Sequence, residues 1–400
     1  MIKPKIRFKG YQEEWEQRKF SEMVTIERGG SPRPIDKFIT NDKNGLNWVK
    51  IGDAPEQGNY ITQTAEKIRP EGLSKTREVH PGDLILSNSM SFGRPYIMAI
   101  DGCIHDGWLA IRDTKKNFDL KFLCTLLGTD SMLNQYKAMA AGSTVNNLNK
   151  ELVGGTIIAF PMLEEQIKIG DYFTSIDHLI TLHHRKCEEM KILKKYMLQK
   201  MFPQNGNSVP EIRFLGFTED WEQRKLGAVA EYRNGKAHEN EIDDDGEYIV
   251  VNSKFVSTNG EIRKFSSAQN EPLYENEIAF VLSDVPNGRA IARTFLIDRS
   301  GKYTLNQRIA GITPHEDTDP YYLYIKMNRN AYFLKFDDGN KQTNLSIKDV
   351  LNYEDMYPSY TEQQKIGEYF CDLDHLITLH QKKCDELRNI KKFMLQNMFI

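Results

Sequence analysis

One 38-residue stretch occurs twice in this chain. Residues 165–202 and 362–399 align without gaps, lie 197 positions apart and share 24 identical residues. After an early Gly, neither copy contains Gly or Pro, and both are rich in Leu, Met, Lys, Glu and Gln, which favour helices. We therefore predict two long helices. At about 1.5 Å per residue each would be roughly 60 Å long, too long for one face to be buried inside a small domain.

Apolar residues in each copy recur at alternating spacings of three and four, which is typical of a coiled-coil seam. The simplest partner for each helix is the other helix. The alternative is that each is a separate amphipathic helix packed on its own domain. The seam residues that we predict are Ile176, Ile180, His183 and Cys187 in the first copy, and Leu373, Ile377, His380 and Cys384 in the second.

The histidines and cysteines of this stretch do not form a metal-binding pattern. His178 and His183 are five residues apart, about 140° around a helix, so they cannot bind one ion from one face. We interpret His183 and His380 as polar residues that fix the register of the seam, and Cys187 and Cys384 as small buried side chains. The chain has five cysteines without paired CxxC spacing, so we expect neither disulfides nor a metal site.

A second repeat shows that the whole chain is duplicated. Residues 6–19 and 212–225 share ten of fourteen positions, and each precedes a variable interior and then a long helix. We expect Trp15 and Trp221 to anchor these opening segments against a core. Residues 203–210 are rich in Pro, Gly, Asn and Ser and mark a boundary. The predicted segments are a first domain (1–160), a first helix (161–203), a second domain (204–357) and a second helix (358–400).

The two interiors indicate mixed strand and helix. Alternating or continuous apolar runs predict strands, and longer periodic runs predict helices, in both halves. The predicted strands are 45–53, 82–87, 246–254 and 276–283, and the predicted helical segments are 119–140 and 320–336. Short similarities link Gly93-Arg94 to Gly288-Arg289, Arg28-Gly29-Gly30 to Arg233-Asn234-Gly235, and Asn147-Leu148 to Asn344-Leu345. Two copies of one α+β domain account for this.

Charge alone does not indicate nucleic-acid binding. The formal net charge is −3, and residues 204–357 carry 18 Lys and Arg against 25 Asp and Glu. If the second domain binds DNA, it must use a local basic face, because affinity depends on the phosphates contacted. No apolar run approaches eighteen residues and the N-terminus lacks the apolar core of a signal peptide, so we expect a cytoplasmic protein without a membrane span.

Motifs of catalysis are missing from the sequence. It contains no phosphate-binding loop, dinucleotide fingerprint, nucleophile elbow or His-Glu-x-x-His motif. Glu261 and Lys264 lack the upstream Asp that a nuclease core requires, which disfavours a free-standing nuclease. The chain is therefore expected to be non-catalytic by itself. A DNA-reading protein and a duplicated adaptor that binds protein partners both remain open.

Polar loops after the second predicted strand of each half carry Ser, Asn, Gly and Arg. Asn paired with adenine and Arg paired with guanine are frequent direct contacts in the major groove. These loops, at 87–95 and 283–291, and nearby polar residues supply our candidates for DNA contact. The candidates are Arg33, Lys50, Ser87, Asn88, Arg94, Trp108, Lys254, Asn287, Arg289, Gln307 and Arg308.

With its EWEQRK or DWEQRK opening segments, variable interiors and DHLITLH helices in one order, the chain resembles a specificity subunit of a type I restriction-modification enzyme. The resemblance covers the whole chain. It implies an α+β fold in which two similar target-recognition domains are separated by two long helices that form an antiparallel coiled coil. It also implies that each domain reads one half of a split double-stranded DNA site, while the helices act as a spacer.

The resemblance further implies which molecules act with this chain. Two modification subunits would dock on the helices and methylate adenine with S-adenosylmethionine. Separate restriction subunits would use ATP and Mg to move and cleave DNA. This chain would bind none of these cofactors itself.

Overall fold

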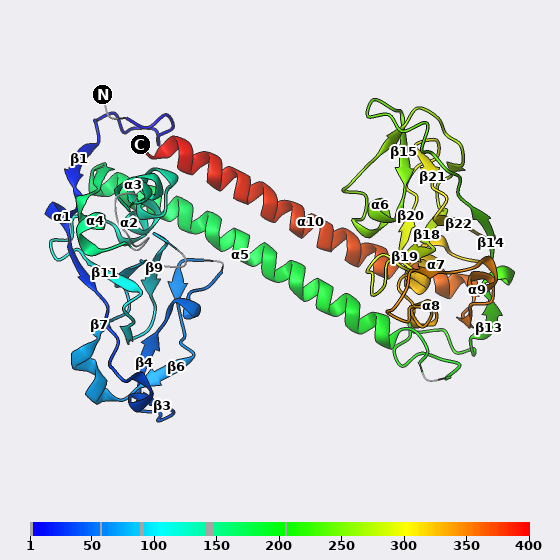
Figure 1. The fold of residues 1–400 in the computed structure, drawn as a ribbon, viewed down its shortest axis with the longest axis horizontal. Helices are drawn as coiled ribbons and strands as arrows, with labels where there is room; N and C mark the ends of the chain where they lie inside the picture. The colour runs from blue at the N-terminus through cyan, green and yellow to red at the C-terminus, as the bar shows by residue number, and fades with distance from the viewer. Residues whose placement is uncertain (1–2, 57, 89–91, 141–147, 205) are drawn as a thin grey trace. The chain divides into compact units, whose positions relative to one another are not determined.

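The computed structural model describes residues 3–56, 58–88, 92–140, 148–204 and 206–400. The chain forms two compact units. Unit 1 comprises Met1–Cys187 with Leu379–Ile400, and unit 2 comprises Glu188–Thr378. Each unit therefore contains one mixed α/β domain and parts of both long helices (Figure 1). The predicted boundaries at 160, 203 and 357 remain a prediction, because the contacts group each domain with helix from the other half of the sequence.

The two long helices are confirmed as α5 (Leu163–Lys200) and α10 (Tyr360–Met398). In unit 1, Lys391 Nζ lies 2.5 Å from Asp177 Oδ1, and Leu387 packs with Ile176 and Ile180. In unit 2, the corresponding Lys194 Nζ lies 2.6 Å from Asp374 Oδ2. As the residue number increases along α5, the number of its partner on α10 decreases. In unit 1 the pairs are Asp177–Lys391 and His183–His380, and in unit 2 they are Lys194–Asp374 and, just beyond the end of α5, Phe202–Phe370, so the helices pair antiparallel within each unit.

Of the predicted seam positions, Ile176, Ile180, His183, Cys187, His380 and Cys384 have contacts to the other helix. Ile176, Ile180, Cys187, Leu373 and Cys384 are buried. The remaining three, His183, Ile377 and His380, are half-buried.

The His183 and His380 rings face each other in unit 1. Their Nδ1 atoms are 2.9 Å apart and the ring planes are tilted by 44°. At this separation one ring donates an N–H to the bare nitrogen of the other. Burial and the neighbouring His380 lower the pKa of His183, which favours the neutral ring that this hydrogen bond requires.

Unit 1 contains two five-stranded sheets. The first has the order β2-β11-β8-β9-β5 and the second has the order β3-β6-β4-β10-β7. The strands of the first are β2 (Thr25–Arg28), β5 (Tyr60–Ile61), β8 (Leu84–Ser87), β9 (Pro95–Met98) and β11 (Trp108–Arg112). Those of the second are β3 (Ile39–Thr40), β4 (Leu46–Val49), β6 (Glu66–Ile68), β7 (Arg77–Val79) and β10 (Gly102–Ile104).

Unit 2 repeats this topology with fewer strands. Its four-stranded sheets have the orders β14-β22-β18-β20 and β16-β15-β21-β17. The strands of the first are β14 (Ala230–Asn234), β18 (Ile278–Val281), β20 (Thr294–Leu296) and β22 (Ile309–Pro314). Those of the second are β15 (Tyr248–Val251), β16 (Phe265–Ser266), β17 (Pro272–Leu273) and β21 (Tyr303–Leu305). The equivalent pairs β4–β10 and β15–β21 are parallel, and unit 1 has a second parallel pair, β5–β9.

Short ladders attach the opening segment of each half. Strand β1 (Glu16–Lys19) pairs antiparallel with β12 (Ile157–Phe160), and β13 (Glu222–Lys225) pairs in the same way with β24 (Glu354–Tyr357). In each unit an opening Arg forms two hydrogen bonds of 2.7 Å to a buried Glu in the first turn of a long helix, Arg7 to Glu165 and Arg213 to Glu362. Unit 2 has one further pair, β19 (Ser283–Asp284) with β23 (Thr343–Asn344).

The predicted helical segments each contain two helices. Residues 119–140 form α2 (Leu120–Leu127) and α3 (Asp130–Ala140), and residues 320–336 form α7 (Pro320–Met327) and α8 (Ala331–Leu334). Asp119 and Asp319 cap the first helix of each pair by accepting from a backbone N–H. The remaining helices are α1 (Phe20–Met23), α4 (Lys150–Gly155), α6 (Ser253–Ser257), α9 (Ile347–Leu351), η1 (Ile35–Lys37), η2 (Ile51–Asp53), η3 (Pro70–Lys75) and η4 (Leu226–Ala228).

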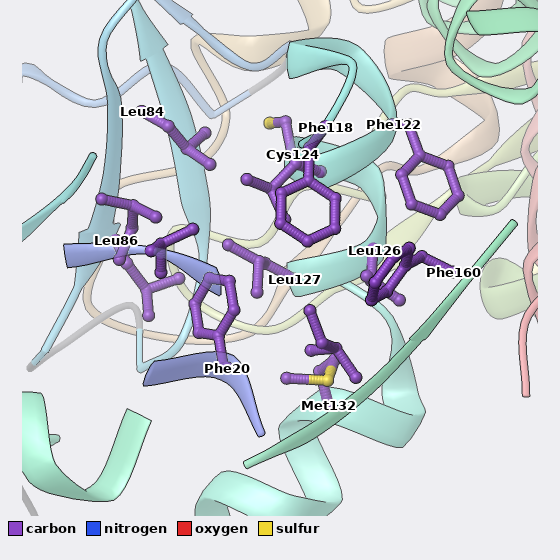
Figure 2. Packing of buried hydrophobic residues seen from close by; sticks show 14 of the residues in the cluster. Phe20, Leu84, Leu86, Phe118, Phe122, Cys124, Leu126, Leu127, Met132 and Phe160 are labelled. Carbon is purple, nitrogen blue, oxygen red and sulfur yellow. The ribbon is translucent and has the colours of Figure 1, made fainter. Parts of the chain in front are cut away.

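One apolar core of unit 1 lies between α2 and the sheet that contains β8, and a second lies on the other face of that sheet. Figure 2 shows Leu127 of α2 on the side of the helix nearer Leu84 and Leu86 of β8, whereas Phe122 and Leu126 lie on the side of Phe160; all belong to one apolar cluster. The predicted anchoring role of the two tryptophans is confirmed, since Trp15 is 2% exposed and Trp221 is 3% exposed. Trp15 packs edge-on against the Phe122 and Phe399 rings, so the end of α10 closes the core of unit 1.

Candidate nucleic-acid interface

Three loops of unit 1 converge at the end of its first sheet. They follow β2, connect β8 to β9 and connect β10 to β11. Asp106, in the last of these, joins them: its carboxylate accepts from Ser31 Oγ at 2.9 Å, and its carbonyl oxygen accepts from Asn88 Nδ2 at 2.9 Å and Arg28 Nε at 3.3 Å. Polar side chains from separate parts of the sequence thus share one surface.

Unit 2 builds the same backbone frame. Gly29 N donates to Trp108 O at 2.9 Å, and Gly235 N donates to Ile309 O at 3.1 Å. A Cβ on Gly29 would lie 2.2 Å from the His105 carbonyl oxygen, and a Cβ on Gly235 would lie 2.0 Å from that of Asn306. Only glycine permits this close approach. Gly29 therefore corresponds to Gly235, one residue away from the alignment that the sequence suggested.

The loop after β8 has the same closing hydrogen bonds in both units. Asn88 N donates to Gly107 O and Leu282 N donates to Arg308 O, at 3.0 and 3.1 Å. Leu148 N and Leu345 N donate back to the carbonyls of Asn88 and Leu282, at 3.0 and 2.8 Å. The predicted match of Leu148 with Leu345 is therefore confirmed, while Asn147 lies outside the described residues.

One predicted correspondence is wrong. Ser87 N donates to Arg94 O, and its equivalent Val281 N donates to Arg293 O, both at 2.9 Å. Gly93 and Ala292 precede these arginines with φ values of 73° and 56°. Arg94 therefore matches Arg293 rather than Arg289. The sequence concealed this because the connection after β18 is five residues longer than the one after β8, and Gly288-Arg289 happens to lie within the extra length.

Three of the DNA-contact candidates in unit 1 are buried, which corrects the prediction. Trp108 and Ser87 are 0% exposed and Asn88 is 2% exposed. Trp108 packs edge-on against Tyr96 in the core, and the Asn88 amide is held by the Asp106 carbonyl. These buried residues support the surface loops and are not themselves exposed for contact with DNA. Ser89, Met90 and Ser91, which belong to the same predicted loop, lie outside the described residues.

The remaining candidates in unit 1 differ in whether their side chains are already bound to other groups of the protein. Arg33 is exposed and has no hydrogen-bond or ion-pair partner among residues 3–56, 58–88, 92–140 and 148–187 of unit 1. Lys50 Nζ lies 2.5 Å from Glu66 Oε1. Both line a hollow of about 940 Å³ together with Ser31, His105 and Asp106. Arg94 donates to the carbonyls of Glu56 and Gly58 and covers the Tyr96 ring, so it braces a loop.

The candidates in unit 2 are all exposed. Lys254, Arg289 and Arg308 have no side-chain hydrogen bond or ion pair with any residue that the structure describes. Asn287 Nδ2 donates to Gly339 O at 3.2 Å, and Gln307 Nε2 donates to Glu239 Oε1 at 3.0 Å. Three of the candidates in unit 2 are therefore uncompensated cationic side chains, although residues 204–357 are acidic overall.

Other basic residues near these loops are already neutralised. Arg233 contacts both Glu271 and Glu277 at 2.5 Å, and Lys236 Nζ lies 2.9 Å from Glu271. Burial by itself would raise the pKa of Glu271, but the hydrogen bonds from Lys236 and Arg233 hold it below its usual value. This carboxylate therefore stays ionised and reduces the positive charge that Arg233 and Lys236 can offer to a phosphate.

The sequence interpretation missed Asp106, Ser31, His105 and Arg293. Asp106 and His105 were close to a candidate stretch, but nothing in their spacing indicates that Ser31, 75 residues away, contacts them. The glycines at 29 and 235 are a signal that could have found them. At these positions the backbone lies so close to the carbonyl of another loop that no Cβ fits, so the glycine indicates that the two loops meet.

The long helices carry a second surface of interest. Several apolar side chains on them remain exposed, and they recur at the 197-residue repeat: Leu179 with Leu376, Leu193 with Ile390, and Tyr196 with Phe393. In each unit the set therefore includes residues from both helices. Exposed apolar side chains that gather on one face are typical of protein interfaces.

Within residues 3–56, 58–88, 92–140, 148–204 and 206–400, no three His, Cys, Asp or Glu residues gather closely enough to hold a metal ion. Among the helices of the same residues, none combines the length and apolar character that crossing a membrane demands.

Comparison with known proteins identifies the architecture. The family model described as "Type I restriction modification DNA specificity domain" matches residues 12–191 and 218–389. The type I restriction enzyme MjaVIII specificity subunit of Methanocaldococcus jannaschii is 24% identical, over 90% of this chain and 89% of its own length. The type I restriction-modification S subunit of M. genitalium has a similar fold, with a TM-score of 0.67, 15% identity and coverage of 100% of this chain and 99% of that one.

A further fold match comes from a type I R-M system whose complex assembly and conformational transition were studied structurally. Its TM-score is 0.53, its identity is 16%, and it covers 96% of this chain and 97% of its own.

Proposed function

Because the chain belongs to the family of type I restriction modification DNA specificity domains, we propose that its two domains each read one half of a bipartite double-stranded DNA site. The chain itself supplies recognition, as the specificity subunit of a type I system. Modification subunits that use S-adenosylmethionine supply methylation of adenine, and restriction subunits that use ATP and Mg supply translocation and cleavage.

The proposal rests on one observation: the loops of the two units have the same backbone arrangement but carry different side chains. The paired loops close on equivalent backbone hydrogen bonds in both units. The side chains on that frame differ: His105, Asp106 and Gly107 in unit 1 stand where unit 2 has Asn306, Gln307 and Arg308. Base edges are read by side chains, whereas phosphates position the protein. Two different sets of side chains on one frame suit two different half-sites.

The exposed apolar residues of α5 and α10 support docking of two copies of one partner. Because the set repeats at 197 residues and each unit combines both helices, equivalent surfaces are presented twice. We assign these surfaces to two modification subunits. Phe393→Asp and Tyr196→Asp should each weaken binding of one of the two subunits, measured by native mass spectrometry of the assembled complex. The exposed Leu215→Asp serves as a control outside the long helices.

Methylation mapping tests the function directly. Cells that carry this chain with its modification subunit should show methylated adenines in a split motif, with half-sites about one helical turn, roughly 34 Å, apart. Inserting four residues after Leu193 adds about 6 Å and about 40° of rotation to α5. A stable insert should therefore methylate a motif with altered spacing, and an unchanged spacing would contradict the role of the helices.

The net acidic composition of residues 204–357 favours a second candidate, a duplicated adaptor that binds only proteins. Retention on double-stranded DNA separates the two candidates. The assembled complex should bind DNA with an affinity that falls steeply with salt. Absence of binding at low salt, with modification subunits present, would favour the adaptor.

A further inference from the structure

One loop position has the same backbone hydrogen-bonding environment in both units but carries a different side chain in each. The loop between β10 and β11 and the loop between β21 and β22 each contain three residues, 105–107 and 306–308. Their first residues donate to equivalent strand carbonyls, His105 N to Val49 O at 3.1 Å and Asn306 N to Val251 O at 3.2 Å. Their last residues accept from Asn88 N and Leu282 N. The middle residues, Asp106 and Gln307, are therefore structurally equivalent.

In both middle side chains, one of the two terminal polar atoms is hydrogen-bonded to a residue that the structure describes and the other is not. Asp106 Oδ1 accepts from Ser31 Oγ and lies 2.9 Å from His105 Nε2, and the side chain is 33% exposed. Gln307 Nε2 donates to Glu239. Within the residues that the structure describes, Asp106 Oδ2 and Gln307 Oε1 have no hydrogen-bond partner. Each unit thus presents one acceptor oxygen on a side chain that a hydrogen bond orients.

The chemistry of these acceptors limits what they can contact on DNA. A carboxylate repels phosphate, so Asp106 cannot contribute to backbone binding. In the major groove the donors are the exocyclic amino groups of cytosine and adenine, and a carboxylate pairs with cytosine N4 whereas a glutamine pairs with adenine N6 and N7. The exposed Arg33, which lines the same hollow as Asp106, is placed to offset the local negative charge.

We propose that this middle loop residue selects a base in each half-site. Asp106 accepts a hydrogen bond from the N4 amino group of a cytosine in the half-site of unit 1, and Gln307 pairs with an adenine in the half-site of unit 2. The proposal rests on the proposed function and deepens it, because it names two specificity-determining residues. Arg308, beside Gln307, belongs to the same reading surface in unit 2, where unit 1 has the buried Gly107.

The test is methylation mapping with Asp106→Asn and Gln307→Ala in the assembled complex. Asp106→Asn turns the free acceptor into a group that also donates, so methylation should spread to motifs in which one base of one half-site is changed. Gln307→Ala should relax one position of the other half-site. Asp101→Asn is the matched control, because Asp101 is an exposed carboxylate of the same unit that pairs with His80 on a different loop.

The outcomes separate the two levels of the proposal. If the wild-type complex methylates no split motif, the proposed function fails and the base-selecting role fails with it. If the wild type and Asp106→Asn methylate the same motif to the same extent, only the base-selecting role is overturned. A loss of methylation at all motifs by Asp106→Asn, with normal unfolding temperature and normal activity of Asp101→Asn, would assign Asp106 to loop structure and would also overturn it.

Discussion

The Trp-centred cores of the two units share one plan, but one buried helix position carries an apolar side chain in unit 1 and a charged one in unit 2. In unit 1, Leu126 belongs to the same apolar cluster as Trp15, Phe122 and Phe399 and is 3% exposed. In unit 2 the equivalent helix position is Lys326, which is 5% exposed. Its Nζ lies 5.4 and 5.8 Å from the ring centroids of Phe202 and Trp221. A cation thus replaces an apolar side chain at the centre of the same fold.

The difference shows that a buried charge is accommodated only with its partners. Lys326 Nζ donates to Met356 O at 2.7 Å and lies 3.2 Å from Asp355 Oδ2. The register of the β1–β12 and β13–β24 ladders places Ile158 of unit 1 where unit 2 has Asp355. Lysine and aspartate therefore occur together in unit 2, and leucine and isoleucine occur together in unit 1. A buried ion without its counter-ion is far costlier than either matched pair.

The largest expected effect comes from exchanging only one member of a pair. Leu126→Lys should destabilise unit 1 by about 4 kcal/mol, because Ile158 offers the cation no partner. Hydrogen–deuterium exchange of β11 peptides in the full chain, with β22 peptides as internal reference, measures this loss. The double variant Lys326→Leu with Asp355→Ile should be neutral or stabilising by about 1–4 kcal/mol. A Leu126→Lys cost below about 1 kcal/mol would show that the partners are not required.

The second prediction concerns pH. Burial, opposed by Asp355, lowers the pKa of Lys326 from 10.5 to about 8. The unfolded chain then binds more protons than the folded chain between these values, so stability rises with pH across this window. The gain should be on the order of 3 kcal/mol. Urea unfolding at pH 7.5 and 10 should show it for the wild type and not for the Lys326→Leu, Asp355→Ile variant; equal pH dependence of the two would contradict the assignment to Lys326.

The third prediction tests a feature that the units share. Glu165→Gln and Glu362→Gln each remove the charge from a buried Glu that Arg7 or Arg213 contacts through two hydrogen bonds. Each should cost about 2 kcal/mol in its own unit. Glu16→Gln, in an exposed pair with Arg18, should cost less than about 0.5 kcal/mol. Thermal unfolding of the three variants measures this, and clearly unequal costs for Glu165 and Glu362 would disprove equivalence of the two attachments.

The smallest effects concern the left-handed residue before the loop arginine. Gly93→Ala should cost about 1–2 kcal/mol, because the backbone conformation disfavours alanine and the new Cβ would lie 2.8 Å from the Tyr136 ring. Ala292→Gly should change stability by less than about 0.5 kcal/mol, since relief of strain is offset by the loss of a buried methyl group. Denaturant midpoints would show this asymmetry; equal and opposite shifts would refute it.

Much of the fold was predictable because repetition and periodicity are local properties. The long helices at 165–202 and 362–399, the anchoring tryptophans and the four interior strands followed from spacing within short windows. The sequence interpretation missed the helix breaks at 128–129 and 328–330, where only two or three residues separate one helix from the next. Of the DNA-contact candidates, Ser87, Asn88 and Trp108 failed, because composition indicates a polar loop but not which side chain points into the core.

The sequence by itself determined that the chain is a duplicated α+β protein with two seam-forming helices, because helix period and self-similarity are written in residue order. Only the tertiary structure decided which loops meet, that Arg94 matches Arg293, and that Asp106 and Gln307 occupy one position. It also decided that the end of each long helix closes the core of the other half's domain, where Ile6 N donates to Asn397 O and Ile212 N to Lys200 O, both at 2.9 Å. These facts depend on strand register and loop length, which long-range hydrogen bonds and packing set together.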